Sequence, residues 1–79
     1  MKIVYEGIEF EVPRGTRYVA ADDGGDVYAY RGREELTYDS GKYRGTDLKY
    51  LGDLPGTVSR KRPAVKVERI IMVTPITNI

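Results

Sequence analysis

The clearest structural signal in the chain is Tyr18-Val19-Ala20-Ala21-Asp22-Asp23-Gly24-Gly25-Asp26-Val27-Tyr28-Ala29-Tyr30. Two apolar and aromatic runs flank a cluster of Asp and Gly, which are the residues that tight hairpin turns require. We therefore predict a β-hairpin with strands over residues 18–21 and 27–30. The aspartates of residues 22–26 are interpreted as turn residues, because their spacing differs from that of a calcium-binding loop.

Similar hairpin signals lie on both sides of this segment. Apolar and acidic residues alternate over residues 8–12, a period that places them on opposite faces of a strand. Glu6-Gly7 is a candidate turn between that strand and one over residues 2–6. An exposed third hairpin is predicted around Asp39-Ser40-Gly41. The other predicted strands cover residues 36–38, 42–44, 48–51 and 64–73.

These patterns predict an all-β fold of about six short strands, in a single domain that covers residues 1–79. A small antiparallel barrel, a two-sheet sandwich and an SH3-like half-barrel all fit the length. The run over residues 64–73 is rich in Val and Ile, which favours a strand, with a helix as the alternative. Apolar runs at residues 3–10 and 70–73 would leave edges able to pair, so we also expect a homo-oligomer.

The composition argues against an enzyme. The sequence has no His and no Cys, and Ser40 and Ser59 are its only serines. A nucleophile and a base that works near neutral pH are therefore both scarce. We predict no catalytic residue, no metal site and no cofactor.

Charge and hydropathy favour a cytoplasmic protein that does not cross a membrane. Thirteen Lys and Arg against twelve Asp and Glu give a net charge of +1, so no overall field points to nucleic acid. The absence of Cys, and of a long apolar run after Met1, favours the cytoplasm. The longest apolar run, Ile70-Ile71-Met72-Val73, is far shorter than the ~20 residues of a transmembrane helix.

Seven tyrosines in so short a chain are the most unusual feature of the composition. Tyr offers a large contact area and a hydroxyl that tolerates water, and it is enriched at protein interfaces. We predict an exposed sheet face that binds a protein partner. Its candidate residues are Tyr28, Tyr30, Tyr38 and Tyr43. The alternative is that these rings fill a small core.

Basic residues interleaved with tyrosines give a second hypothesis, a small β-barrel that binds nucleic acid. Its candidate residues are Lys42, Lys49, Arg60, Lys61 and Arg62. The alternative for this cluster is a solvated loop, because the net charge is close to zero. A third hypothesis is a small-ligand site at the interface of an oligomer.

Residues 18–30, followed by Leu48-Lys49-Tyr50-Leu51-Gly52, resemble short accessory proteins encoded by tailed bacteriophages. Those proteins often combine a strand, an Asp/Gly turn, an aromatic return strand and a segment of the type Tyr-Leu-Gly. The resemblance implies a phage origin, and a partner that is a host or defence protein in the host cytoplasm. It assigns no functional residue.

Overall fold

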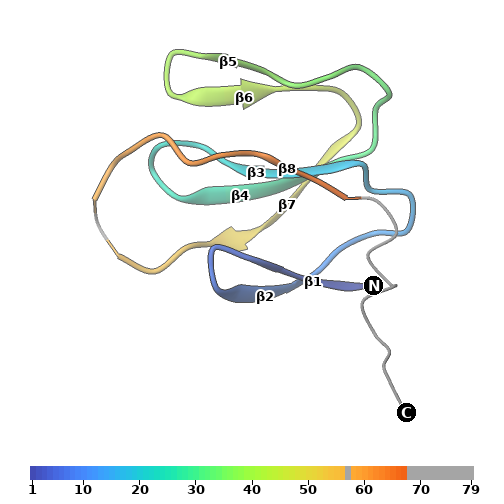
Figure 1. Ribbon diagram of the computed structural model, residues 1–79, viewed down its shortest axis with the longest axis horizontal. Helices are drawn as coiled ribbons and strands as arrows, with labels where there is room; N and C mark the ends of the chain where they lie inside the picture. The colour runs from blue at the N-terminus through green and yellow to red at the C-terminus, as the bar shows by residue number, and fades with distance from the viewer. Residues whose placement is uncertain (57, 68–79) are drawn as a thin grey trace.

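Residues 18–30 form the predicted hairpin at the centre of the structure (Figure 1). In this computed structural model, which describes residues 1–56 and 58–67, β3 spans Tyr18–Ala21 and β4 spans Asp26–Tyr30. The carboxylate of Asp22 closes the turn by accepting a 2.9 Å hydrogen bond from the backbone NH of Asp26. The aspartate cluster is therefore a turn, as predicted.

β3 and β4 are the two inner strands of an antiparallel sheet with the order β7-β4-β3-β8. β7 spans Leu48–Asp53 and is the longest strand in the described part of the chain. Its register with β4 shifts between Val27 and Tyr28, which marks a bulge. β7 confirms the strand predicted over residues 48–51 and extends it by two residues.

β8 spans Val65–Lys66 and pairs with Tyr18 and Val19 of β3. The strand predicted over residues 64–73 is thus confirmed for these two residues. Residues 64 and 67 lie outside this strand, so the predicted strand is too long at both of these positions. Residues 68–73 lie outside the described residues, where the prediction is untested.

Two further hairpins stand apart from this sheet as two-stranded sheets. β1 spans Lys2–Tyr5, β2 spans Ile8–Glu11, β5 spans Thr37–Asp39 and β6 spans Lys42–Arg44. Each has a two-residue turn with positive φ at both positions, 52° and 78° at Glu6 and Gly7, and 54° and 82° at Ser40 and Gly41. Such turns match the twist of paired strands, and both predicted hairpins are confirmed with their turns at these residues.

The β1–β2 hairpin covers one face of the four-stranded sheet, which we call the valine face. This face consists of Val19, Ala21, Val27 and Ala29, and the hairpin packs Ile3, Tyr5, Phe10 and Val12 against it. Period-two alternation explains the arrangement, since the apolar positions of each strand share one side. The resulting cluster is the hydrophobic core.

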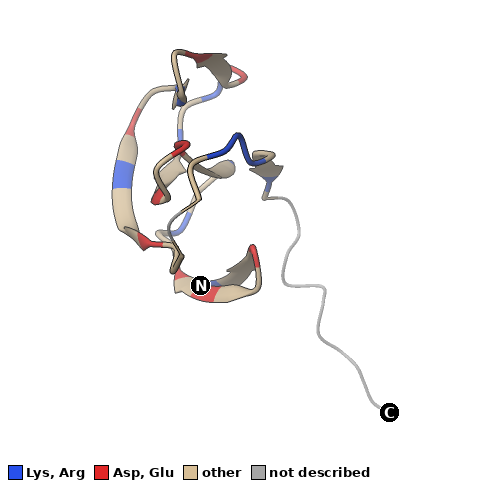
Figure 2. Ribbon diagram, turned by 90° about the vertical axis from the view of Figure 1, so that its left-hand side faces the viewer, with Lys and Arg blue, Asp and Glu red and all other residues tan. Residues whose placement is uncertain are grey.

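The opposite face of the sheet, which we call the tyrosine face, carries Tyr18 opposite Tyr30 and Ala20 opposite Tyr28. The β5–β6 hairpin lies over part of it (Figures 1 and 2). Gly45 permits this close approach, because a Cβ atom at that position would lie 2.8 Å from Cδ2 of Tyr30. The hairpin buries Tyr30 and leaves Tyr28 half-exposed.

The all-β prediction is confirmed, with eight short strands in residues 1–56 and 58–67 and no helix among them. None of the sheets in this part of the chain closes into a barrel, which corrects the barrel alternative. Closure would require the edge strands β7 and β8 to pair, but they lie at opposite edges of an open sheet. The two extra hairpins cover its faces instead, in layers.

The buried hydroxyl of Tyr5 joins the β1–β2 hairpin to the sheet. It accepts a 3.1 Å hydrogen bond from the backbone NH of Ala21 and donates one of 2.9 Å to the carbonyl of Pro63. β8 pairs with β3 only as far as Val19, so the hydroxyl takes the place of a strand partner at Ala21.

We expect Tyr5→Phe to lower the free energy of unfolding by about 1–3 kcal/mol, because a buried NH and a carbonyl both lose their partner. Urea denaturation followed by circular dichroism measures this change. Tyr28→Phe, on the other face of the sheet, is the matched control and should change stability by less than about 0.5 kcal/mol. Equal losses in the two variants would contradict the role given to Tyr5.

Candidate functional site

Tyr30, one of the four tyrosines predicted to contact a partner, is not available for that role. Its side chain is only 3% exposed, and its hydroxyl donates a 3.2 Å hydrogen bond to the carbonyl of Tyr43. Burial raises the pKa of Tyr30 to about 12. The expected exposure of Tyr30 is therefore corrected, because the β5–β6 hairpin covers this end of the tyrosine face.

Tyr38 and Tyr43 are half-buried and fasten the β5–β6 hairpin to the rest of the domain. Each hydroxyl donates a 2.6 Å hydrogen bond, Tyr38 to the carboxylate of Asp23 and Tyr43 to the carbonyl of Arg62. The bond to Asp23 raises the pKa of Tyr38 to about 12. The two rings meet edge to face, with centroids 5.1 Å apart. Their structural contacts leave only part of each ring for a partner.

The exposed part of the tyrosine face is formed by Tyr28, Leu48 and Tyr50, which we call the aromatic patch. Leu48 and Tyr50 are each 51% exposed, and the rings of Tyr28 and Tyr50 meet edge to face at 5.5 Å between centroids. In the register of the sheet, Tyr50 lies opposite Tyr28 and Leu48 lies opposite Tyr30. The sequence prediction included Tyr28 but missed Leu48 and Tyr50.

A shallow recess adjoins the aromatic patch, with a volume of about 190 Å³. It is lined by Asp22, Tyr28, Tyr30, Lys42, Tyr43 and Leu48. Its volume is smaller than the ~300–1,000 Å³ typical of small-molecule sites. A recess of this size beside an aromatic surface is suited to one side chain of a partner protein.

Carboxylates border the aromatic patch at the end where β7 finishes. Asp26 and Asp53 are direct cross-strand partners, and Asp53 accepts a hydrogen bond from the hydroxyl of Tyr50. The hydrogen bond with Asp53 raises the pKa of Asp26, and the nearby charge of Asp22 adds to the effect. The bond from Tyr50 lowers the pKa of Asp53 and raises that of Tyr50 to about 12. This end of the patch is electronegative.

The basic residues predicted to bind nucleic acid are largely engaged within the protein. Arg62 is only 7% exposed, and its guanidinium donates to the carbonyls of Asp22, Asp23, Arg60 and Val58 over 3.0–3.4 Å. Arg60 forms an ion pair of 3.2 Å with Glu6, and Lys61 lies 4.4 Å from the centroid of the Tyr38 ring. Arg62 therefore has structural contacts, which leave little of its side chain exposed for a phosphate.

The structure does not gather the remaining basic candidates into one surface. Lys42 lines the recess beside Tyr28, whereas Lys49 lines a separate hollow with Pro13, Arg31 and Asp47. Figure 2 shows the longest basic stretch in the segment that leads to β8, with acidic positions spread over the rest of the molecule.

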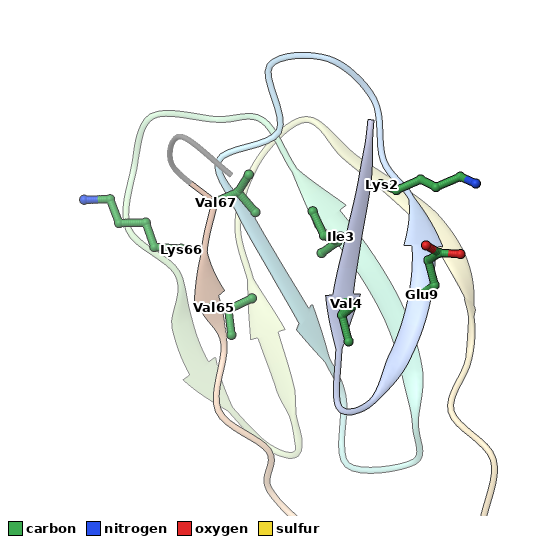
Figure 3. Close-up of a pocket in the computed structure, with 7 residues that line it drawn as sticks. All are labelled: Lys2, Ile3, Val4, Glu9, Val65, Lys66 and Val67. Carbon is green, nitrogen blue, oxygen red and sulfur yellow. The ribbon is translucent and has the colours of Figure 1, made fainter. Parts of the chain in front are cut away.

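A second surface feature is a groove of about 410 Å³ between β1 and β8. Figure 3 shows Ile3 of β1 turned toward Val65 and Val67 across this groove, with Lys2 and Lys66 pointing outward on either side. The groove is open and mainly aliphatic. It has no converging polar groups of the kind that orient a small ligand.

The described residues show two further points that bear on function. Within residues 1–56 and 58–67, no three acidic side chains are grouped closely enough to hold a metal ion. No helix in that part of the chain has the length and apolar character to span a membrane. Comparisons with protein-family models, with curated proteins and with solved structures found no match.

We expect Arg62→Met to lower the free energy of unfolding by about 2–3 kcal/mol, because several part-buried carbonyls lose a charged donor. Arg60→Met is the matched control. It removes an exposed ion pair, which contributes only ~0.2–1 kcal/mol. Urea denaturation of both variants makes the comparison. An Arg62 variant as stable as the Arg60 variant would contradict the structural role of Arg62.

We expect Asp26→Asn to raise the melting temperature at pH 7 by about 1–3 °C, because it removes a like charge opposite Asp53. A raised pKa means that folding favours protonated Asp26, so the wild type loses this repulsion as the pH falls toward 3.8, the ordinary value for Asp. The gain from the substitution should therefore shrink in the same range. Thermal melts from pH 7 to pH 3 test this, and a gain that does not change with pH would refute it.

Proposed function

We propose that this domain is a non-catalytic binding module that engages a protein partner through the aromatic patch of Tyr28, Leu48 and Tyr50. The observation behind the proposal is that two large side chains on one sheet face are half-exposed beside a recess. Monomeric proteins usually expose apolar side chains singly, whereas grouped ones mark sites of interaction.

The chemistry of the patch supports a protein partner. Tyr28 and Tyr50 are aromatic anchors with few rotatable bonds, so they lose little entropy when a partner orders them. Leu48 adds aliphatic area, and the recess offers a place for a side chain of the partner. Polar groups surround the patch, as in interfaces with an apolar centre and a wet rim.

The resemblance to accessory proteins of tailed phages extends the proposal to the class of partner. On that basis the partner is a host or defence protein, and the site of action is the host cytoplasm. Homo-oligomerisation stays a separate prediction, which size-exclusion chromatography with light scattering would test.

The alternative hypotheses receive less support from the geometry. Arg62 is buried and Arg60 is paired with Glu6, so the nucleic-acid hypothesis retains only Lys61 of the basic run, besides the separated Lys42 and Lys49. Binding to single-stranded DNA or RNA that weakens steeply with salt would favour that hypothesis. The small-ligand hypothesis would need a site completed by a second copy.

We expect the double variant Leu48→Ser/Tyr50→Ser to lose at least about tenfold in partner capture, as is typical when interface anchors are removed. Quantitative mass spectrometry of proteins retained from bacterial lysate measures the loss. Val4→Ser is the matched control, because Val4 is 68% exposed but lies on the β1–β2 hairpin, away from the patch.

Circular dichroism of both variants should match the wild type, since all three side chains are exposed. The expected result is a bacterial protein that the wild type and Val4→Ser both retain and that Leu48→Ser/Tyr50→Ser does not. Equal retention by the wild type and the patch variant would refute the proposal.

A further inference from the structure

Within residues 1–56 and 58–67, β7 has a free edge along the aromatic patch. It pairs with β4 on one side only and is a terminal strand of the open sheet. Figure 2 shows it along one margin of the described part of the chain, with no other described strand outside it. An edge strand presents unpaired NH and carbonyl groups, which can pair with a strand from another chain.

The side chains of β7 are placed to assist such pairing on one face. Leu48 and Tyr50 point to the tyrosine face and are half-exposed, and the bulge comes after Tyr50, so the first half of the strand is regular. A strand added beside β7 would place alternate side chains against this pair.

We propose that the partner contributes an extended segment that adds to the free edge of β7 and carries a Lys or Arg beside Asp53. The inference rests on the proposed function and names its binding mode and chemistry. Backbone pairing supplies register and affinity, and the side chains against Leu48 and Tyr50 supply selectivity.

The preference for a basic residue follows from the charges at the end of β7. Asp26 and Asp53 are like charges directly opposite each other, an arrangement that destabilises an antiparallel pair. The negative charge of Asp22 also raises the pKa of Asp26, and the positive charge of Lys42 lowers it. A Lys or Arg next to Asp53 would neutralise part of this excess and form charge-assisted hydrogen bonds.

A second copy of this chain fits the same edge less well. A two-fold axis centred on Tyr50 would place Asp47 opposite Asp53 of the other copy, and one centred on Lys49 would place two lysines opposite each other. Like charges opposite each other disfavour pairing, and a Lys on an edge strand is a common protection against self-association. The two registers centred on the regular part of β7 therefore favour a different chain over a second copy.

A display library of random twelve-residue peptides, selected against the full 79-residue chain, tests the inference. We expect the enriched peptides to alternate apolar and polar residues and to contain Lys or Arg. Replacing single peptide NH groups of the best binder by N-methyl groups should weaken binding at least tenfold at every second position and little at the others. This alternation is specific to strand pairing.

Variants of the domain separate the two parts of the inference. Asp26→Asn/Asp53→Asn should weaken a basic peptide at least fivefold and leave its Lys-to-Gln analogue unchanged, whereas Glu34→Gln/Glu35→Gln, on the exposed loop before β5, should affect neither. A uniform effect of N-methylation, or equal affinity of basic and neutral peptides, would overturn the inference. After either of these outcomes, the selected peptides can still be tested against the Leu48→Ser/Tyr50→Ser variant. If they bind this variant more weakly than the wild type, the proposed function of the aromatic patch is retained although the strand-pairing inference fails.

Discussion

Asp23, at the tip of the β3–β4 hairpin, holds together three segments that are far apart in the sequence. Its carbonyl accepts hydrogen bonds from the guanidinium of Arg62 and from the backbone NH of Arg60, at 3.0 and 3.2 Å. Its carboxylate accepts from Tyr38, and its backbone NH donates 2.8 Å to the carbonyl of Gly41. The turn at residues 22–26 thus fixes the segment before β8 and the β5–β6 hairpin at the same time. Both would lose their position if this turn changed.

The tyrosines differ in what their hydroxyls contact. Tyr5, Tyr30, Tyr38 and Tyr43 donate to groups in other segments of the domain, and three of these acceptors are backbone carbonyls. Their hydrogen bonds connect separate segments of a chain that has no Cys for disulfides. Tyr50 donates to Asp53 of its own strand. Tyr28 and Tyr50 lie beyond the cover of the β5–β6 hairpin. On the tyrosine face, the same residue type therefore both anchors the β5–β6 hairpin and forms the exposed aromatic patch.

The hairpins could be predicted from the sequence because each depends on local turn chemistry. Glu6-Gly7 and Ser40-Gly41 set their own registers, and the Asp/Gly cluster at residues 22–26 does the same for β3 and β4. The candidate site was harder to predict because exposure depends on how distant elements pack. Nothing local to Tyr30 indicates that a hairpin with Gly45 at its base will cover it.

Other parts of the site could be predicted in part from the sequence. Leu48 and Tyr50 are two residues apart in a predicted strand, so the sequence indicates that they share a face. It does not indicate that this strand lies at the edge of the sheet. For Arg62, the sequence of a basic run is the same whether its side chains are solvated or donate to carbonyls within the protein. Only the course of the chain past Asp22 and Asp23 distinguishes the two. The open sheet, in place of a barrel, likewise depends on which strands become neighbours.

The short pairing of β8 with β3 has a consequence for how the domain folds. The three hairpins close over turns of two to four residues, so their contacts are local and can form on a microsecond timescale, whereas Val65 must reach Val19 across most of the chain. Loop-closure entropy makes this the slow step. β8 offsets it with only two residue pairs, and the rest comes from separate hydrogen bonds, such as those of Arg60, Arg62 and Val67. The segment from residue 58 to residue 67 should accordingly be the last to dock and the first to open, with amide protons that exchange before those of β3 and β4.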